Sequence, residues 1–488
     1  MKIALLALYD HNSLSVRRLH AVLEKNGFNV CSYFLKLAFD ISGVIPEVTE
    51  RESNILMSML KEYGPDIVGV SIMSTHFQLA AEISKRVKTE INAHVVWGGI
   101  HPTLCPGECL DFADSVCIGE GEGAILDLSE RISRQADISD IKNLWIKKGD
   151  NIIKNDVRPL ILNMDEVPFT DFSDKNKYYI ENDKVYRHRP TPFYQYIIIT
   201  MRGCPFECSY CSTSAVKQLY KNEEKYFCRR SVENVIGELK TAVNEFKNLR
   251  TIRFWDDIFT LDKNWLKEFT REYKANFKLP FFCYPHPQII DEETIDMLKD
   301  AGLRGVKVGI QNGSDFVRKD IFNRTESAED IIRLGTLLKK YGISVIYDVI
   351  TDTPFEDEDD MRKTLELLLK LPKPFKIYLH KLCFYKKSEI TRRAIENKLI
   401  TEDDIIGKQK SIIQQGILPT TIKKYRNKDK VFWFSLYYLT GKKFVPNMII
   451  EYLSRNKFIR RNPYIIAFFK ECTYRIYLFV RKFIRTHM

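Results

Sequence analysis

Three cysteines stand close together in the segment TMRGCPFECSYCSTS, with the spacing C-x3-C-x2-C. They are Cys204, Cys208 and Cys211. Zinc sites usually take four ligands in two close pairs, and the next cysteine, Cys228, has no second cysteine near it. Iron–sulfur clusters are held by closely spaced thiolates, and a missing fourth thiolate leaves one iron open to a substrate or cofactor. The spacing therefore favours an iron–sulfur cluster with one open iron.

The residues around and after this loop alternate between short apolar runs and helical patterns. This alternation predicts βαβ units and a parallel sheet, in which chemistry is found at the carboxyl ends of the strands. The expected strands are residues 195–200, 251–255, 280–284, 305–310, 343–350 and 375–380. The expected helices are residues 231–246, 263–276, 292–301, 328–341 and 358–371.

The cysteine loop resembles the signature of the radical S-adenosylmethionine (SAM) enzymes. An aromatic residue, Tyr210, stands directly before the third cysteine, and Gly203 and Pro205 shape the loop. The resemblance implies that the three cysteines ligate a [4Fe-4S] cluster whose open iron binds SAM. It also implies that the reduced cluster cleaves SAM to a 5′-deoxyadenosyl radical, and that the fold is a partial (β/α)6 barrel with the loop after its first strand.

Polar residues follow the second and fourth predicted strands of this barrel. The segment FWDDIFT contains Asp256 and Asp257, and the segment GIQNGSD contains Gln311, Asn312 and Ser314. The resemblance implies that these places bind the amino group and ribose of SAM, although an Asp pair and a Gln stand where the family commonly has Glu. The two Asp residues would also fit a simpler role as caps of the next helix.

Residues 1–140 predict a separate α/β domain ahead of the barrel. Its apolar runs at 3–9, 28–34, 66–72, 94–99 and 115–123 alternate with helical patterns, as in a Rossmann-like sheet. The first run is followed by YDHNS instead of G-x-G-x-x-G, so a dinucleotide is not expected. Glycines at the predicted strand ends leave room for a large ligand near the backbone.

Three segments of this domain together resemble the cobalamin-binding domain that is fused ahead of some radical SAM barrels. They are Ser71 after the third strand, VVWGGIHPT at 95–103 and IGEGEG at 118–123. The resemblance implies a set of cobalamin contacts at the carboxyl edge of the sheet. These residues are Ser71, Gly98, Gly99, Gly119, Glu120 and Gly121.

The histidine that some cobalamin proteins supply to cobalt has no counterpart in this sequence. The motif D-x-H-x-x-G would require His and Gly where Asn12 and Ser15 stand. We therefore expect cobalamin bound with its own base displaced and without a histidine on cobalt. His76 and His101 fall in loops near the predicted strand ends, where a hydrogen-bonding or surface role is favoured over cobalt ligation.

The predicted fold class is α/β with a helical carboxy-terminal tail. We expect a cobalamin-binding Rossmann-like domain at 1–140, a linker with a hairpin at 141–189, a radical SAM barrel at 190–400 and a basic, mainly helical extension at 401–488. Eleven scattered cysteines do not suggest a disulfide framework, and the sequence has neither a secretory signal nor an apolar run of eighteen residues. These features predict a cytoplasmic protein that works without oxygen.

The tail holds the positive charge of the chain. Residues 421–488 contain sixteen Lys and Arg against three acidic residues, whereas the formal charge of the whole chain is +11. An apolar stripe at helical spacing accompanies the charge: Ile465, Phe468, Phe469, Cys472, Ile476, Phe479, Val480 and Phe483. Such a helix could lie peripherally on the inner face of the membrane, or it could dock its stripe on the barrel. Nucleic acid is not expected, because no recognition motif accompanies the charge.

The two resemblances together imply a cobalamin-dependent radical SAM enzyme. Methyl transfer to an unactivated carbon is the favoured reaction, and radical ring closure or rearrangement, as in the anaerobic porphyrin cyclases, is the first alternative. A non-catalytic cobalamin and iron–sulfur sensor is the second alternative. The expected partners are a small-molecule or lipid substrate and an electron donor such as flavodoxin or ferredoxin.

Overall fold

The computed structural model describes residues 1–37, 47–220, 226–405 and 427–468 of the 488-residue chain. The chain divides into two compact units. The first comprises Met1–Arg250 and Cys383–Ile413, and the second comprises Thr251–Leu382 and Gln414–Met488. The break after Arg250 falls inside residues 190–400, which the sequence assigns to one barrel.

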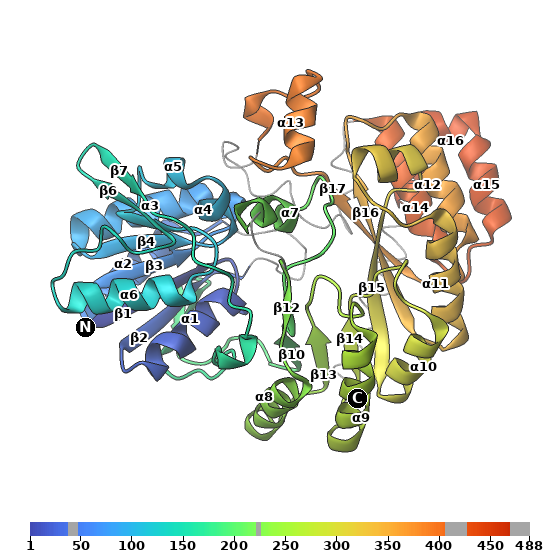
Figure 1. Ribbon diagram of the computed structural model, residues 1–488. Coiled ribbons are helices and arrows are strands. Elements are labelled where there is room, and N and C mark those ends of the chain that lie inside the picture. The colour runs from blue at the N-terminus through green and yellow to red at the C-terminus, as the bar shows by residue number, and fades with distance from the viewer. Residues whose placement is uncertain (38–46, 221–225, 406–426, 469–488) are drawn as a thin grey trace. The chain divides into compact units, whose positions relative to one another are not determined.

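The first unit is built on a nine-stranded sheet with the strand order β7-β6-β5-β4-β3-β1-β2-β8-β9 (Figure 1). Its five central strands are parallel, and each begins within one residue of a predicted run. They are β1 (Lys2–Leu8), β2 (Asn29–Leu35), β3 (Ile67–Ser71), β4 (His94–Gly98) and β5 (Ser115–Cys117). The order 2-1-3-4-5 is that of a doubly wound α/β sheet, so the predicted Rossmann-like domain is confirmed.

The segment predicted as a linker supplies both edges of this sheet. The hairpin of β6 (Leu144–Lys148) and β7 (Asn151–Lys154) pairs antiparallel with β5. At the other edge, β8 (Lys177–Glu181) pairs parallel with β2 and carries β9 (Lys184–Tyr186) outside it. These additions cover strand edges that would otherwise expose unpaired backbone groups.

Helices cover both faces of the first sheet. Side chains of β1 alternate between the two faces, with Leu5 in one apolar core and Leu6 in the other. The core of Leu5 is covered by α1 (Leu14–Lys25) and α6 (Glu122–Ser133), and the core of Leu6 by α2 (Glu50–Tyr63) and α3 (Phe77–Glu90). The short helices α4 (Ile100–Leu104) and α5 (Pro106–Cys109) follow the end of β4.

The remainder of the first unit carries the cysteine loop. The loop lies between β11 and α7, and β11 pairs antiparallel with β12. The elements in chain order are β10 (Gln195–Ile198), β11 (Met201–Arg202), α7 (Ser212–Lys217), β12 (Cys228–Arg229), α8 (Val232–Glu245) and α13 (Glu389–Glu396).

The second unit contains five parallel strands that neighbour one another in chain order. They are β13 (Thr251–Phe254), β14 (Phe281–Cys283), β15 (Leu303–Gln311), β16 (Ser344–Thr351) and β17 (Lys376–Lys381). Between them lie α9 (Lys263–Asn276), α10 (Glu292–Asp300), α11 (Ala328–Lys340) and α12 (Glu358–Lys370). The strand and helix alternation predicted for this part of the chain is confirmed.

The capping role considered for Asp256 and Asp257 is wrong. Helix α9 begins after Asp262, whose side chain accepts hydrogen bonds from the backbone amides of Asn264 and Trp265. Asp262 takes this role because it directly precedes the first helical residue, which is the position from which a side chain reaches those amides.

The carboxy-terminal region is helical, as predicted, over the part that the structure describes. Helices α14 (Lys428–Thr440), α15 (Asn447–Arg455) and α16 (Lys457–Arg461) lie beside α12 (Figure 1). The hydroxyl of Tyr437 donates a 2.7 Å hydrogen bond to the carbonyl of Met361. Most of the apolar stripe predicted at 465–483 lies outside the described residues. Within them, no helix is long and apolar enough to cross a membrane.

Candidate functional site

The cysteine loop begins at a position that only glycine can occupy, Gly203. Gly203 has a φ of +86°, and a Cβ at this position would collide with the carbonyl oxygen of Tyr226. The loop then passes Cys204 and Cys208 and reaches Cys211, which stands directly before α7. The backbone amide of Cys211 donates a 3.1 Å hydrogen bond to the carbonyl of Cys208. Together these contacts shape the loop without using the three thiols.

All three cysteines are partly exposed, as ligands of an inserted cluster should be. Cys208 and Cys211 line a cavity of about 1010 Å³. Its other wall comes from the segment around α13, which is tied to the loop because the amide of Ile390 donates to the carbonyl of Ser209 at 3.1 Å. The three predicted ligands therefore lie on one loop with room beside them for a group larger than a single ion.

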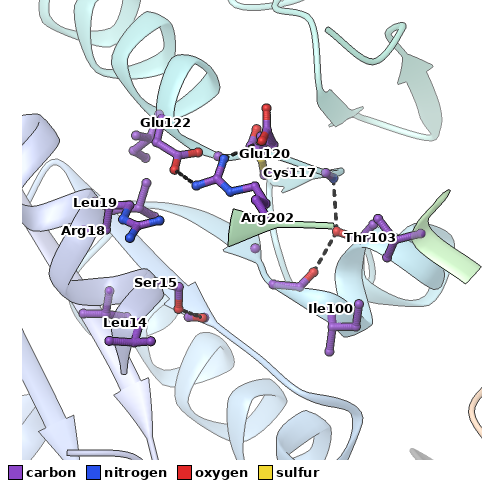
Figure 2. Close-up of a pocket in the computed structure, with 18 of the residues that line it drawn as sticks. Leu14, Ser15, Arg18, Leu19, Ile100, Thr103, Cys117, Glu120, Glu122 and Arg202 are labelled. Atoms are coloured by element: carbon purple, nitrogen blue, oxygen red, sulfur yellow. Dashed lines mark hydrogen bonds and ion pairs between the residues drawn. The ribbon is translucent and has the colours of Figure 1, made fainter. Parts of the chain in front are cut away.

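A second cavity, of about 380 Å³ and mainly apolar, lies at the carboxyl ends of β3, β4 and β5 (Figure 2). All six residues that the sequence predicted as cobalamin contacts line it: Ser71, Gly98, Gly99, Gly119, Glu120 and Gly121. Gly99 has a φ of +107°, and its Cβ would lie 2.7 Å from the carbonyl oxygen of Ile72. The strand-end glycines thus permit a backbone path that leaves this space open.

The same cavity extends between the sheet and the helices α1 and α6. It is lined there by Leu19 and Leu128, and by Gly69 in the middle of β3. A Cβ on Gly69 would lie 2.9 Å from the side chain of Leu5, so a larger residue would fill this apolar slot. The sequence analysis missed Gly69 because it sits inside an apolar run that is typical of any buried strand, where a glycine signals a close approach. A slot of this kind suits a flat apolar group.

An arginine at the end of β11, directly before the cysteine loop, reaches into the rim of this cavity. Arg202 pairs with Glu120 and, at 2.6 Å, with Glu122 (Figure 2). Burial alone would lower the pKa of Arg202, but the two carboxylates outweigh it and raise the pKa above its ordinary value. The same contact holds the pKa of Glu122 low against its own burial. Two residues before Cys204, the chain is therefore fixed to the edge of the apolar cavity.

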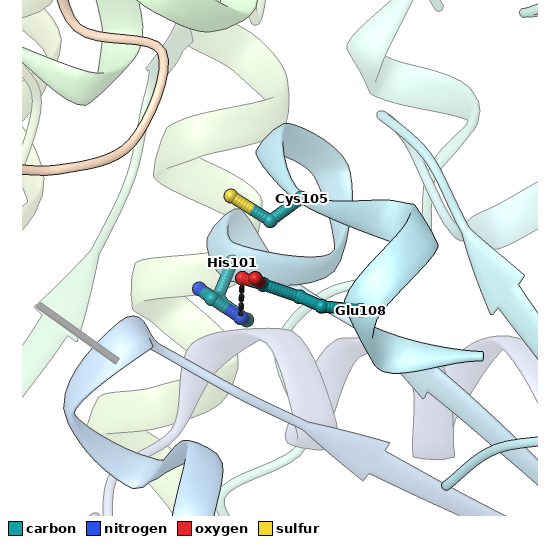
Figure 3. Close-up of side chains that lie close together, drawn as sticks. All are labelled: His101, Cys105 and Glu108. Atoms are coloured by element: carbon teal, nitrogen blue, oxygen red, sulfur yellow. Dashed lines mark ion pairs between the residues drawn. The ribbon is translucent and has the colours of Figure 1, made fainter. Parts of the chain in front are cut away.

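His76 and His101, which the sequence analysis placed in loops, lie in a short 3₁₀ helix and in α4, and neither lines the apolar cavity. His101 is buried, with Nδ1 3.0 Å from the hydroxyl of Ser74 and Nε2 3.2 Å from Glu108 (Figure 3). The Glu108 carboxylate also receives the ammonium of Lys386 at 2.8 Å. Cys105 completes a group whose ligand atoms lie within 4.8 Å of one another. Since Lys386 already supplies a positive charge, the group is accounted for as a buried hydrogen-bonded anchor of α4 and α5.

The SAM-contact candidates differ in how far they are exposed. Asn312 and Ser314 are buried, and the Asn312 amide donates a 2.9 Å hydrogen bond to Glu356. Asp256 is also buried, whereas Asp257 reaches solvent. Its crowded surroundings and the neighbouring Asp256 carboxylate raise the pKa of Asp257 to about 6. Gln311 ends β15 in the left-handed region, with a φ of 58°, and is partly exposed.

The sheet of the second unit carries a charged row that the sequence analysis missed. Asp348 on β16 lies 2.8 Å from the ammonium of Lys307 on β15 and 3.1 Å from the Nε2 of His380 on β17. All three are partly exposed, while the residues beside them in sequence, such as Val308 and Leu379, are buried under the helices. One signal was present: Lys307 and Asp348 each stand between two apolar residues within their strands.

Two family models match separate parts of the chain. One, described as B12 binding domain, matches residues 2–129, and the other, described as Radical SAM superfamily, matches residues 198–368. The chain carries a B12-binding domain and a radical SAM domain. The B12-binding domain contains the strands β1 to β5 that end at the apolar cavity, and the radical SAM domain contains the cysteine loop.

Sequence relatives share both parts at moderate identity. The uncharacterized methyltransferase PH0819 of Pyrococcus horikoshii is 28% identical over 337 residues, which cover 68% of this chain and 69% of the relative. The cytidylyl-2-hydroxyethylphosphonate methyltransferase of Streptomyces wedmorensis is 24% identical, covering 59% and 58%. The anaerobic magnesium-protoporphyrin IX monomethyl ester cyclase of Cereibacter sphaeroides is 25% identical, covering 69% and 55%. The chain thus spans just over half the length of the last two.

Solved structures share the fold. The radical SAM methyltransferase TsrM from Kitasatospora setae, with cobalamin and a [4Fe-4S] cluster bound, matches with a TM-score of 0.61 at 20% identity, covering 81% of this chain and 75% of its own. The radical enzyme OxsB, with aqua-cobalamin and SAM bound, matches with a TM-score of 0.66 at 14% identity, covering 93% and 75%. At these identities the likeness shows the fold alone.

The two domains define the cofactors of the chain as a [4Fe-4S] cluster, SAM and cobalamin. The residues fit all three. Partly exposed thiols on a glycine-shaped loop suit a cluster, and the wide space beside Cys208 and Cys211 suits a ligand on its open iron. The apolar slot at Gly69 suits the nucleotide base of cobalamin when that base is displaced from cobalt.

Proposed function

We propose that this radical SAM enzyme is a cobalamin-dependent methyltransferase that acts on an unactivated carbon. The observation that carries the proposal is the Arg202 contact, since it joins the cysteine loop to the rim of the cobalamin cavity within one compact unit. Two sequence relatives named as methyltransferases support it. When bound, the cluster supplies the electron that cleaves SAM, and cobalamin carries the methyl group.

The protein residues hold and orient these groups. Cys204, Cys208 and Cys211 bind the cluster, and Gly203 gives the loop its path. Gly69, with the strand-end glycines, accepts cobalamin with its base in the apolar slot. Among the residues that the structure describes, those lining that cavity include no histidine, which supports cobalamin bound without a protein histidine on cobalt.

We assign SAM binding in the second unit to the exposed groups at the ends of β13 and β15. Asp257 and Gln311 offer a carboxylate and an amide to the amino group and ribose of SAM. The other three candidates are buried, so they position Asp257 and Gln311 from the protein interior: Asp256, Asn312 and Ser314. Asn312 does so through Glu356 and through Thr364, whose hydroxyl donates to Asn312 at 3.1 Å.

The first experiment uses the protein reconstituted without oxygen with iron, sulfide and cobalamin. With reductant and SAM, the wild type should release 5′-deoxyadenosine, and Cys208→Ala should lose both the cluster iron and this release. The buried Cys31→Ala is the matched control, since it removes a thiol far from the loop in sequence and should change neither. A Cys208→Ala protein that still cleaves SAM would refute the ligand assignment.

A second measurement separates methyl transfer from ring closure. Methyl transfer with cobalamin would consume the methyl group of SAM, so the reduced, cobalamin-loaded protein should form S-adenosylhomocysteine even without substrate. The relative named as a porphyrin ester cyclase favours ring closure as the second candidate. Release of 5′-deoxyadenosine with no S-adenosylhomocysteine would support the cyclase-like reaction, and a bound cluster with no SAM cleavage would support a sensor.

The reaction also needs partners. We propose a small-molecule or lipid substrate and a one-electron donor such as flavodoxin or ferredoxin. The cavity beside Cys208 and Cys211 supports an approach of the donor from that side, because there the loop reaches solvent. This assignment can be tested directly by adding reduced flavodoxin and measuring the loss of absorbance of the oxidised cluster.

A further inference from the structure

Helix α15 exposes an apolar face to solvent. The exposed fraction is 70% for Phe444, 76% for Met448, 46% for Ile449 and 66% for Tyr452. Phe444, Met448 and Tyr452 follow one another at steps of four residues, so they form one continuous row along the helix and its entry. We call this row, with Ile449, the α15 face. Phe458, on the following helix α16, is exposed to 65%.

The opposite side of α15 is already packed. Ile450 is fully buried, and the amide of Asn447 donates a 2.8 Å hydrogen bond to the carbonyl of Leu369 on α12. The ammonium of Lys373 donates to the carbonyl of Val445, just before the helix. Because α15 packs against the rest of the unit through this side, the exposed row is a second apolar surface that takes no part in that packing.

Positive charge surrounds the α15 face. Among residues 442–461, all within the described part of the chain, six are Lys or Arg and one, Glu451, is acidic. Arg460 is engaged by Glu358 and Asp429. The exposed basic side chains nearest in sequence to the apolar row are Lys443, Arg455, Lys457 and Arg461. A surface that combines exposed aromatic and aliphatic groups with unmatched positive charge is complementary to anionic lipid headgroups over an apolar layer.

We propose that the α15 face binds the surface of an anionic lipid bilayer. Phe444, Met448 and Tyr452 would enter the headgroup layer, and Lys443 and Lys457 would pair with lipid phosphates. This contact is peripheral, and it is independent of the reaction proposed above. It places the interfacial part of the tail at 444–458, ahead of the stripe that the sequence analysis singled out.

The test is flotation of the full-length holoprotein with vesicles. The wild type should float with vesicles of phosphatidylglycerol mixed with phosphatidylcholine, and it should float far less with phosphatidylcholine alone or in high salt. The double variant Met448→Ser with Tyr452→Ser should bind about tenfold more weakly, because two apolar insertions are lost. Lys443→Gln with Lys457→Gln should weaken binding to anionic vesicles only.

Matched controls keep the result interpretable. Leu162→Ser removes another exposed apolar side chain, 57% exposed, from the first unit and should leave flotation unchanged. Iron content and circular dichroism should be equal in all variants, which excludes misfolding. Unchanged flotation of the Met448/Tyr452 variant would overturn the proposal. So would a loss of flotation on truncation after residue 468 with the α15 face intact, or a wild-type dimer that this double variant converts to monomer.

Discussion

The two units build their sites in opposite ways. The first sheet is covered by helices on both faces, and its cavity is lined by glycines that stand where a Cβ would collide with a neighbouring residue: Gly69, Gly99 and Gly119. The second sheet has one face packed under helices, and its other face carries added charge at Lys307, Asp348 and His380. Substitution of these glycines by larger residues should therefore damage the first site, and neutralisation of these charged side chains should damage the second.

Filling the apolar slot should have the largest effect. Gly69→Val places two methyl groups where Leu5 and the cavity meet, so we expect loss of nearly all bound cobalt while the four irons of the cluster remain. Metal analysis of the reconstituted protein measures both. Gly107→Val is the control, since nothing lies near a Cβ at that position. Equal cobalt in both variants would place cobalamin elsewhere.

The contact between the loop and the cavity rim should come next. Arg202→Met leaves the carboxylates of Glu120 and Glu122 without their partner, which should lower the free energy of unfolding by about 3 kcal/mol. Urea unfolding measures this loss. Arg131→Met breaks an exposed pair with Asp140 and should change stability much less. A similar small loss for Arg202→Met would mean that the loop is held by other contacts.

A half-buried acid in the second unit, Glu356, should make stability depend on pH. Burial raises the pKa of Glu356 to about 8, whereas an unfolded chain releases this proton near pH 4.3. The native state therefore binds more protons between these values, and the free energy of unfolding should fall as pH rises from about 4.3 to 8. Glu356→Gln should remove most of that slope and be more stable than the wild type at pH 8. Parallel pH profiles would contradict the assignment.

The charged row should contribute least to stability. Asp348→Asn weakens its contacts with Lys307 and His380, both partly exposed, and should cost about 1 kcal/mol. Val308→Ala, on the packed side of the neighbouring strand, should cost about 2 kcal/mol because it leaves a cavity. Urea unfolding of both compares the two faces. If Asp348→Asn were the more damaging change, the row would be structural rather than a surface kept for binding.

Local signals in the sequence were enough to find the loop, the sheets and the residues that line the apolar cavity. The three cysteines are close together in the chain. The predicted cobalamin contacts of the first sheet follow recognisable apolar runs, and all six line one cavity. Gly69 was missed because a glycine inside an apolar run leaves the strand pattern unchanged. Its effect depends on Leu5, which lies on the neighbouring strand β1.

Contacts between distant parts of the chain were beyond the sequence pattern. Arg202 and Glu120 are separated by 82 positions, and Lys307 and His380 meet only through Asp348 on the strand between them. Periodicity says which face a residue occupies, but it does not say which charged side chain will lie opposite. The capping alternative for Asp256 and Asp257 failed for a related reason, since a cap is defined by the first helical residue, and that residue lies after Asp262.

The Arg202 contact also sets an order of assembly on the ribosome. Glu120 and Glu122 are synthesised well before Arg202, so the amino-terminal sheet can fold first and capture the arginine as it emerges. Ile390, whose backbone amide donates a hydrogen bond to the carbonyl of Ser209, is synthesised after all of these residues. During the synthesis of the residues between them, the cysteine loop is shaped at one end and still uncovered at the other.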